Sequence, residues 1–164
     1  MLTRRQVLNA CVYAFAEISA SGLLRGATAR AATDEQITHT DAEWRKLLTP
    51  DQYAVLRHEG TERPFTSPLL HEERAGTFAC AGCDLALFSS KTKFDSGTGW
   101  PSFWTPLDNA VATKEDRSFG MIRTAVMCRR CAGHIGHVFN DGPPPTGLRY
   151  CMNGVAMNFI PDAA

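Results

Sequence analysis

The 164-residue sequence has no excess of charge of either sign, because 17 Lys and Arg residues balance 17 Asp and Glu residues. A neutral chain offers no electrostatic argument for nucleic acid or an anionic membrane as its main partner. The sequence also lacks a long, clean apolar run, which argues against an ordinary transmembrane helix. Charged residues make up only 21% of the chain, so we expect one folded domain with a modest core rather than bulk disorder.

Unpaired cysteine is also scarce. Four of the six cysteines form two Cys-x-x-Cys pairs, Cys80 with Cys83 and Cys128 with Cys131. Such a pair aims both sulfurs at one point, and two pairs satisfy a tetrahedral zinc site. A disulfide framework, which is usual in small secreted domains, is the alternative. Because both pairs are present together, we predict a structural Zn²⁺ at these four residues.

Residues 1–31 have the pattern of an export signal. Arg4 and Arg5 lie in a stretch that resembles a twin-arginine motif, a moderately apolar segment follows, and Ala29-Arg30-Ala31 offers a cleavage site. We therefore predict a periplasmic or exported mature protein of residues 32–164, with a cytoplasmic location as the alternative. The twin-arginine route carries folded proteins, so zinc could be loaded before export and protect the thiolates. A frayed or helical N-terminal extension is the other interpretation.

Two short helices are expected at the start of the mature region. Thr40 can cap a helix over residues 41–48, and Thr49 followed by Pro50 can begin a second helix over 51–57. The apolar residues expected on one face of the first helix are Trp44, Leu47 and Leu48. We expect both helices to cover one side of a sheet.

From residue 64 onward, short apolar or alternating runs are separated by Gly, Pro, Ser and Asp. This spacing favours antiparallel β structure, as a barrel or as packed sheets. The candidate strands are residues 77–79, 85–89, 100–104, 111–112, 121–127, 137–139 and 150–159.

The remaining cysteine of the mature region, Cys151, has polar neighbours that suit thiol chemistry. In an extended strand Arg149, Cys151 and Asn153 share one face, and a nearby arginine favours the thiolate. His134 and His137, three residues apart, could donate hydrogen bonds to an oxygen or hold water. A lone cysteine is more often an inert core thiol, but these neighbours favour a nucleophile.

These motifs together resemble the methionine-R-sulfoxide reductase (MsrB) family, over almost all of the mature region. The stretches that carry the resemblance are GTERPF at 60–65, CAGC at 80–83, FDSGTGWPSF at 94–103, CRRCAGHIGHVF at 128–139 and GPPPTGLRYCMN at 142–153. Their number and order make chance similarity improbable.

The resemblance implies a mainly β fold of two antiparallel sheets, the β-tent of this family, with short N-terminal helices and a structural zinc between the cysteine pairs. It implies that Cys151 is the catalytic cysteine, with Arg149 beside it. It also implies that Trp100 packs against the S-methyl group of the substrate, with Phe103 as a further substrate-binding residue. The residues implied to line the sulfoxide site are His134, His137 and Asn153.

The implied reaction is reduction of methionine-R-sulfoxide, peptide-bound rather than free, in the repair of oxidised proteins. Cys151 would attack the sulfoxide sulfur, become a sulfenic acid and be reduced by an external thiol, such as that of a thioredoxin-like protein. Many family members carry a resolving cysteine where this chain has Thr98, so we predict a one-cysteine enzyme. Separately, we expect a monomer. A zinc-ribbon binding module without catalysis and a disulfide-stapled secreted domain are the alternatives.

Overall fold

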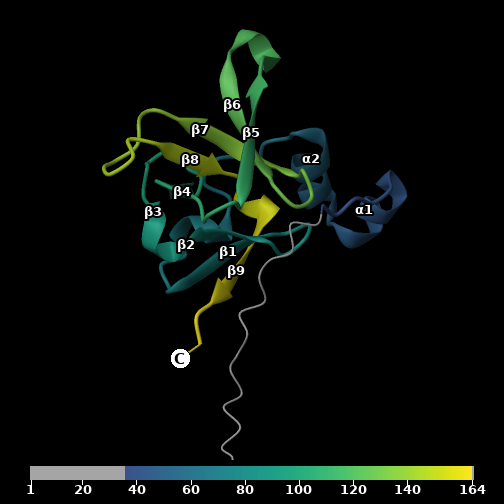
Figure 1. The fold of residues 1–164 in the computed structure, drawn as a ribbon, viewed down its shortest axis with the longest axis horizontal. Coiled ribbons are helices and arrows are strands. Elements are labelled where there is room, and N and C mark those ends of the chain that lie inside the picture. The colour runs from purple at the N-terminus through teal and green to yellow at the C-terminus, as the bar shows by residue number, and fades with distance from the viewer. Residues whose placement is uncertain (1–35, 164) are drawn as a thin grey trace, which may run out of the picture. The chain divides into compact units, whose positions relative to one another are not determined.

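The computed structural model describes residues 36–163, and the predicted signal segment 1–31 lies outside this range. Within it, two antiparallel sheets and two short α-helices make up the fold (Figure 1). The prediction of a mainly β protein with two antiparallel sheets is thus confirmed. Neither α-helix of the described part is long and apolar enough to cross a bilayer.

The two α-helices begin where their caps predict. Helix α1 spans Asp41–Leu47 and α2 spans Pro50–His58. Thr40 and Thr49 each accept a hydrogen bond from the backbone N–H three residues on, and the side chain of that residue accepts one from the backbone N–H of the threonine, so both helices carry a capping box. Leu47 does not join the buried face, since it is 59% exposed. The expectation was wrong because Trp44 and Leu48, four residues apart, already form the buried stripe.

Nine strands of residues 36–163 form the two sheets. The three-stranded sheet has the order β2 (Ala86–Ser89), β1 (Gly76–Cys80) and β9 (Met157–Pro161). The six-stranded sheet has the order β3 (Lys93–Phe94), β4 (Ser102–Phe103), β8 (Arg149–Met152), β7 (His134–Phe139), β6 (Arg123–Cys128) and β5 (Val111–Asp116). The described residues also contain four short 3-10 helices. The first, η1 (Pro68–His71), precedes β1, and the others lie between strands: η2 (Ser90–Thr92), η3 (Ser118–Gly120) and η4 (Gly154–Ala156).

Most expected strands are present, but the predicted strand 150–159 is wrong. It is interrupted after Met152 by η4, and its two halves belong to different sheets. The break has a tertiary cause: the Glu62 carboxylate accepts the backbone N–H groups of Gly154 and Val155, so they cannot join a ladder. Strand β3 was not expected, and the strand predicted over 100–104 is shorter.

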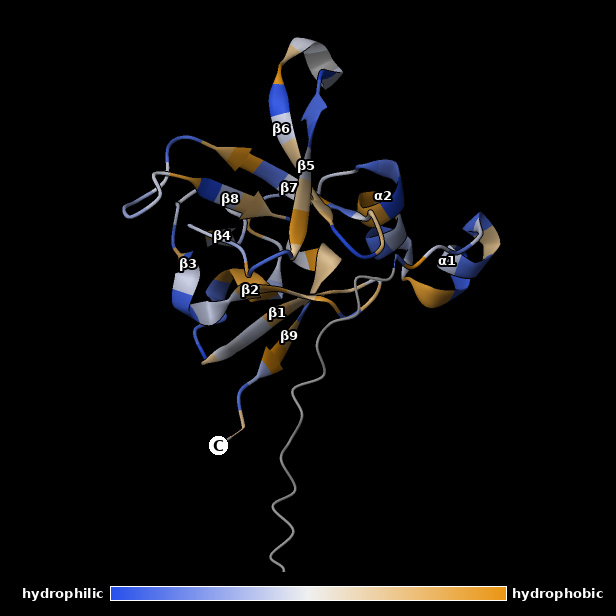
Figure 2. Cartoon of the chain, in the orientation of Figure 1, coloured by the Kyte–Doolittle hydropathy of each residue, from blue (hydrophilic) through white to orange (hydrophobic). Residues whose placement is uncertain are grey.

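Aromatic packing fills the core beside the sheets. The ring of Phe103 stacks on Phe88 at 4.4 Å and meets the edge of Phe78 at 4.9 Å, and all three side chains are fully buried. By contrast, the β5–β6 hairpin projects from the rest of the domain, and the outer end of its strand β5 is hydrophilic (Figure 2). A side chain on this hairpin can therefore reach a site at its base without belonging to the core.

Strands β7 and β8 approach so closely at Gly136 that only glycine fits. A Cβ there would lie 2.2 Å from the backbone oxygen of Cys151 and 2.9 Å from the Cα of Met152. We expect Gly136→Ala to lower the free energy of unfolding by about 2 to 3 kcal/mol, as overpacking against backbone does. Urea unfolding measures this. Gly82→Ala is the control, because its methyl group would find ordinary contacts at 3.6 Å. Equal stability of the two variants would contradict the prediction.

Candidate active site and metal centre

The four paired cysteines come together from both sheets. Cys80 ends β1 and Cys128 ends β6, while Cys83 and Cys131 lie in the turns that follow. Both turns are built alike: the residue after the second cysteine, Asp84 or Ala132, has a positive φ, and its N–H donates to the carbonyl of the first cysteine. The four sulfurs all lie within 4.8 Å of one another.

The spacing of these sulfurs fits a tetrahedral metal ion. Cys80 and Cys131 are 3.7 Å apart, and Cys83 and Cys128 are 3.5 Å apart. A tetrahedron with Zn–S bonds of about 2.3 Å has edges of about 3.8 Å. Four thiolates this close together would repel one another, so a bound cation would stabilise all four in the charged form. The residues therefore form a site able to hold a divalent metal.

Cys151 lies at a separate, small cavity of about 110 Å³. Its strand neighbours are His137 on β7 and Ser102 on β4, each directly opposite it in the ladder. The side chains that line this cavity are Thr61, Trp100, Arg123, His137, Phe139, Cys151 and Asn153. Four residues predicted from the sequence, from three separate segments, therefore meet at one cavity: Trp100, His137, Cys151 and Asn153.

His137 is held by a carboxylate from the β5–β6 hairpin. Its Nε2 lies 2.8 Å from Oδ2 of Asp116, which also accepts from Arg123 Nη2 at 2.7 Å. Hydrogen bonds, above all from the backbone N–H of Ser118, hold the pKa of Asp116 well below its ordinary value. Burial lowers the pKa of His137 despite this partner. A neutral His137 that donates Nε2–H to Asp116 keeps Nδ1 as a proton acceptor.

His134 does not line this cavity. It is 1% exposed, its ring lies 5.2 Å from that of His137, and neither of its nitrogens has a hydrogen-bond partner among the described residues. Burial lowers its pKa to about 4. A proton on His134 is thus strongly disfavoured, and of the two histidines His137 is the one at the cavity.

Arg149 is paired with a carboxylate while it stays near the thiol. Its Nε and Nη2 donate to Asp141 at 2.9 and 2.8 Å, and its guanidinium lies 4.4 Å from the centre of the Phe139 ring. The bond to Asp141 is the main cause of its raised pKa, and Cys151 also contributes. Arg149 therefore brings a fixed positive charge beside Cys151.

Phe103, predicted to bind substrate, is fully buried in the aromatic core and does not line the cavity. Its strand, β4, pairs with β8, so Phe103 lies opposite Tyr150, next to Cys151. It supports the site through packing.

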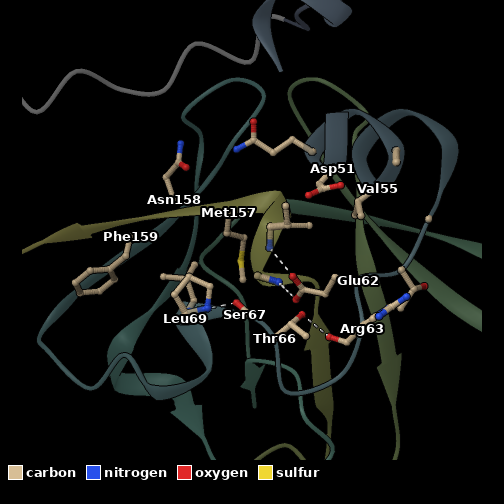
Figure 3. Close-up of a pocket in the computed structure, with 17 residues that line it drawn as sticks. Asp51, Val55, Glu62, Arg63, Thr66, Ser67, Leu69, Met157, Asn158 and Phe159 are labelled. Atoms are coloured by element: carbon tan, nitrogen blue, oxygen red, sulfur yellow. Dashed lines mark hydrogen bonds between the residues drawn. The ribbon is translucent and has the colours of Figure 1, made fainter. Parts of the chain in front are cut away.

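Glu62 is a supporting residue to which the sequence interpretation assigned no role. Its backbone N–H donates to Asn153 Oδ1 at 3.0 Å, and its carbonyl accepts from Trp100 Nε1 at 3.1 Å. Its carboxylate accepts from Gly154 and Val155, and it lines a second cavity of about 880 Å³ (Figure 3). Glu62 therefore holds two residues of the Cys151 cavity at once. The available signal was its place in the GTERPF stretch.

Asp116 and Arg123 were also not identified from the sequence. They lie on the hairpin, 21 and 14 residues before His137, and no local pattern connects them with a histidine. Only the pairing of β5, β6 and β7 brings them together.

The buried, uncharged state of His134 has a consequence for stability. Its pKa of about 4 lies below the ordinary value of 6.5, so between these values the unfolded chain takes up a proton that the folded protein does not. Protonation of His134 in the unfolded chain therefore does not lower the unfolding free energy above pH 6.5. As the pH falls from 6.5 toward 4, it lowers the unfolding free energy by at most about 1.4 kcal/mol per pH unit.

We therefore expect the unfolding free energy of the protein to fall more steeply from pH 6.5 to 4.5 than that of His134→Phe. Urea unfolding at several pH values measures both curves, and carboxylate effects common to the two proteins cancel. Parallel curves would show that the buried imidazole has no such role.

Comparison with known proteins covers most of the chain. A family model described as the SelR domain matches residues 48–161. A protein from Pseudomonas putida (strain W619), named peptide methionine sulfoxide reductase MsrB, is 58% identical over 128 residues, which cover 77% of this chain and 96% of the relative.

Proteins of the same name from other organisms are similar to it as well. The one from Agrobacterium fabrum is 53% identical over 130 residues, covering 79% of this chain and 96% of the relative. The one from Methanosarcina barkeri is 53% identical over 124 residues, covering 75% of this chain and 87% of the relative. Identity at this level over nearly the whole described range shows the family, and the chain belongs to the MsrB family of SelR-domain proteins.

Proposed function

We infer that this protein is a peptide methionine sulfoxide reductase, and we propose that Cys151 carries out the reaction on the R epimer. The main support is the cavity at Cys151, where a thiol, an imidazole, an amide and an indole meet. The relatives with the printed name peptide methionine sulfoxide reductase supply the reaction class.

The first step transfers oxygen between two sulfurs. The Cys151 thiolate attacks the sulfoxide sulfur and an S–S bond forms. The oxygen, protonated as charge builds on it, moves to the Cys151 sulfur while the substrate S–O bond and the S–S bond break, so methionine leaves and Cys151 becomes a sulfenic acid. Two electrons pass from the cysteine sulfur to the substrate. One thiol plus one sulfoxide gives one sulfenic acid plus one thioether, so the atoms balance. The oxygen gains negative charge during this step and needs a proton donor.

His137 is the better candidate for handling this proton. It lies opposite Cys151 in the ladder and lines the cavity, whereas His134 is buried and does not line the cavity. As a neutral ring, His137 can accept the thiol proton on Nδ1 and then donate it to the sulfoxide oxygen. The Asp116 carboxylate at Nε2 stabilises the imidazolium that exists between these two events.

The substrate is oriented by two kinds of contact. The Trp100 indole offers an apolar surface for the S-methyl group, and Asn153 offers an amide close to the oxygen. Because Glu62 holds both, their separation is set by one residue. Fixing the methyl group and the oxygen of a chiral sulfur leaves one face for Cys151, which is the origin of the proposed R preference.

The cycle is completed by an external thiol. With Cys80, Cys83, Cys128 and Cys131 committed to the metal centre, no second cysteine of the described range is free to attack the sulfenic acid. Two equivalents of thiol, or a thioredoxin-like dithiol, convert it to the cysteine, a disulfide and water. The protein acts as a monomer in this proposal.

The metal proposed at the four cysteines is zinc, with a structural role. It would hold the two Cys-x-x-Cys turns together and protect their thiolates from oxidation, and it would take no part in the reaction at Cys151. Export by the twin-arginine route, with metal loaded before transport, remains a prediction from residues 1–31.

The decisive experiment is turnover on the separated R and S epimers of a methionine sulfoxide peptide, with dithiothreitol as reductant. We expect turnover of the R epimer only, and a loss of more than about 1,000-fold in Cys151→Ser, because the nucleophile is removed. Wild-type protein oxidised by one equivalent of substrate should show no internal Cys151 disulfide in a peptide map. If folded, metal-loaded protein turns over neither epimer, the chain is a binding module instead.

Loss of one metal ligand should act on folding. We expect the wild-type protein to bind one zinc ion per chain and Cys83→Ser to bind none. The variant should also have a thermal midpoint lower by about 10 °C or more, because structural zinc contributes several kcal/mol to folding and each kcal/mol shifts the midpoint by about 4 °C. Elemental analysis and calorimetry measure both effects. Cys151→Ser is the matched control and should keep the metal and the midpoint. A metal-free Cys83→Ser that melts like wild type would exclude the structural role.

A further inference from the structure

A chain of three hydroxyl groups ends at the sulfur of Cys151. Thr98 Oγ1 lies 3.7 Å from Cys151 Sγ and 2.8 Å from Ser96 Oγ. Ser96 Oγ in turn lies 2.8 Å from Ser102 Oγ. At the far end, Ser102 donates to the carbonyl oxygen of Trp100 at 3.2 Å. Ser102 is fully buried, so the chain connects a buried hydroxyl group with the thiol of Cys151.

Counting protons shows that this chain has two possible directions. Each hydroxyl has one proton, and a carbonyl can only accept. When Ser102 donates to the Trp100 carbonyl, Ser96 donates to Ser102 and Thr98 donates to Ser96. Thr98 then presents a lone pair to Cys151, which suits a protonated thiol.

The opposite direction suits a thiolate. Thr98 then donates to the sulfur, Ser96 donates to Thr98, and Ser102 donates to Ser96. The change requires only rotation of hydroxyl protons, and all heavy atoms stay in place. It gives up the long bond from Ser102 to the carbonyl in exchange for a hydrogen bond to a charged sulfur, which is the stronger kind.

We propose that this hydroxyl chain reverses when Cys151 loses its proton, so that Thr98 donates to the thiolate that attacks the substrate. The proton leaves through the cavity, and the three hydroxyls keep theirs. Thr98 is then a catalytic residue that touches the reacting sulfur. The role of Cys151 as nucleophile rests on the proposed function, but the reversal concerns the thiol alone and can be tested without turnover.

Charged groups also face Cys151, from other elements. Arg149 lies on its own strand, His137 with its partner Asp116 lies opposite on β7, and Arg123 reaches the cavity from the hairpin. The hydroxyl chain approaches Cys151 from β4 and from the turn before it. Variants within the chain leave these charges unchanged, so their effect cancels in a comparison.

The test is the rate at which iodoacetamide alkylates Cys151 in the zinc-loaded full chain, followed by mass spectrometry between pH 6 and 9. Thr98→Val keeps the shape but removes the hydroxyl, and we expect it to slow alkylation near neutral pH by about 3- to 10-fold. Thr98→Ser keeps the hydroxyl and should stay within about twofold of wild type. An unchanged or faster Thr98→Val overturns the proposal, since a Thr98 that only accepts would favour the thiol.

Ser96→Ala tests the reversal itself. It disconnects Thr98 from Ser102, so forming the thiolate no longer breaks the bond from Ser102 to the Trp100 carbonyl. Alkylation should therefore be at least as fast as in wild type, opposite in direction to Thr98→Val. If both variants are slowed alike, packing of the turn is responsible and the reversal is excluded. Wild-type turnover on the R epimer is measured separately, so failure of the proposed function and failure of this inference can be told apart.

Discussion

The meeting of four sulfurs from two different sheets is the constraint on which the domain depends. Cys80 ends a strand of the three-stranded sheet, and Cys128 ends a strand of the six-stranded sheet. Strand β7 begins directly after the turn that contains Cys131, so the start of the strand depends on where Cys131 is held. Arg57 of α2 donates to the carbonyl of Cys131 at 2.9 Å and joins the helix to the same point. A structural metal there would secure the register that brings His137 opposite Cys151.

A second tie works from the other end of the site. Glu62 comes from a loop, yet its backbone and carboxylate together hold Trp100, Asn153 and the start of η4. Burial raises the pKa of its carboxyl, against the two backbone N–H groups that favour its charged form. A partly buried carboxylate costs desolvation energy, and it is tolerated here because its hydrogen bonds satisfy it. The cavity geometry thus rests on polar contacts outside the regular ladders.

The surroundings of Cys151 combine groups with different tasks. Arg149 supplies a positive charge that Asp141 holds in place, and His137 supplies a neutral ring that Asp116 orients. Thr98 adds a hydroxyl whose single proton can point either way. In the proposed mechanism these groups respond to charge on the Cys151 sulfur when His137 takes up a proton or the Thr98 hydroxyl turns, and no heavy atom has to move.

The sequence by itself determined the features encoded within a few residues. The two Cys-x-x-Cys pairs, the capped starts of α1 and α2 and most of the short strands follow from local spacing and residue type, and so does the choice of Cys151 as the candidate nucleophile. Tertiary structure alone decided the partners of the buried polar groups: Asp116 for His137, 21 residues away, and Glu62 for Val155, 93 residues away. It also broke the predicted strand 150–159, because a distant carboxylate took the backbone N–H groups that a ladder would have used. Local propensity acts over one or two turns of chain, whereas a buried donor or acceptor must be satisfied by whatever group the fold brings to it.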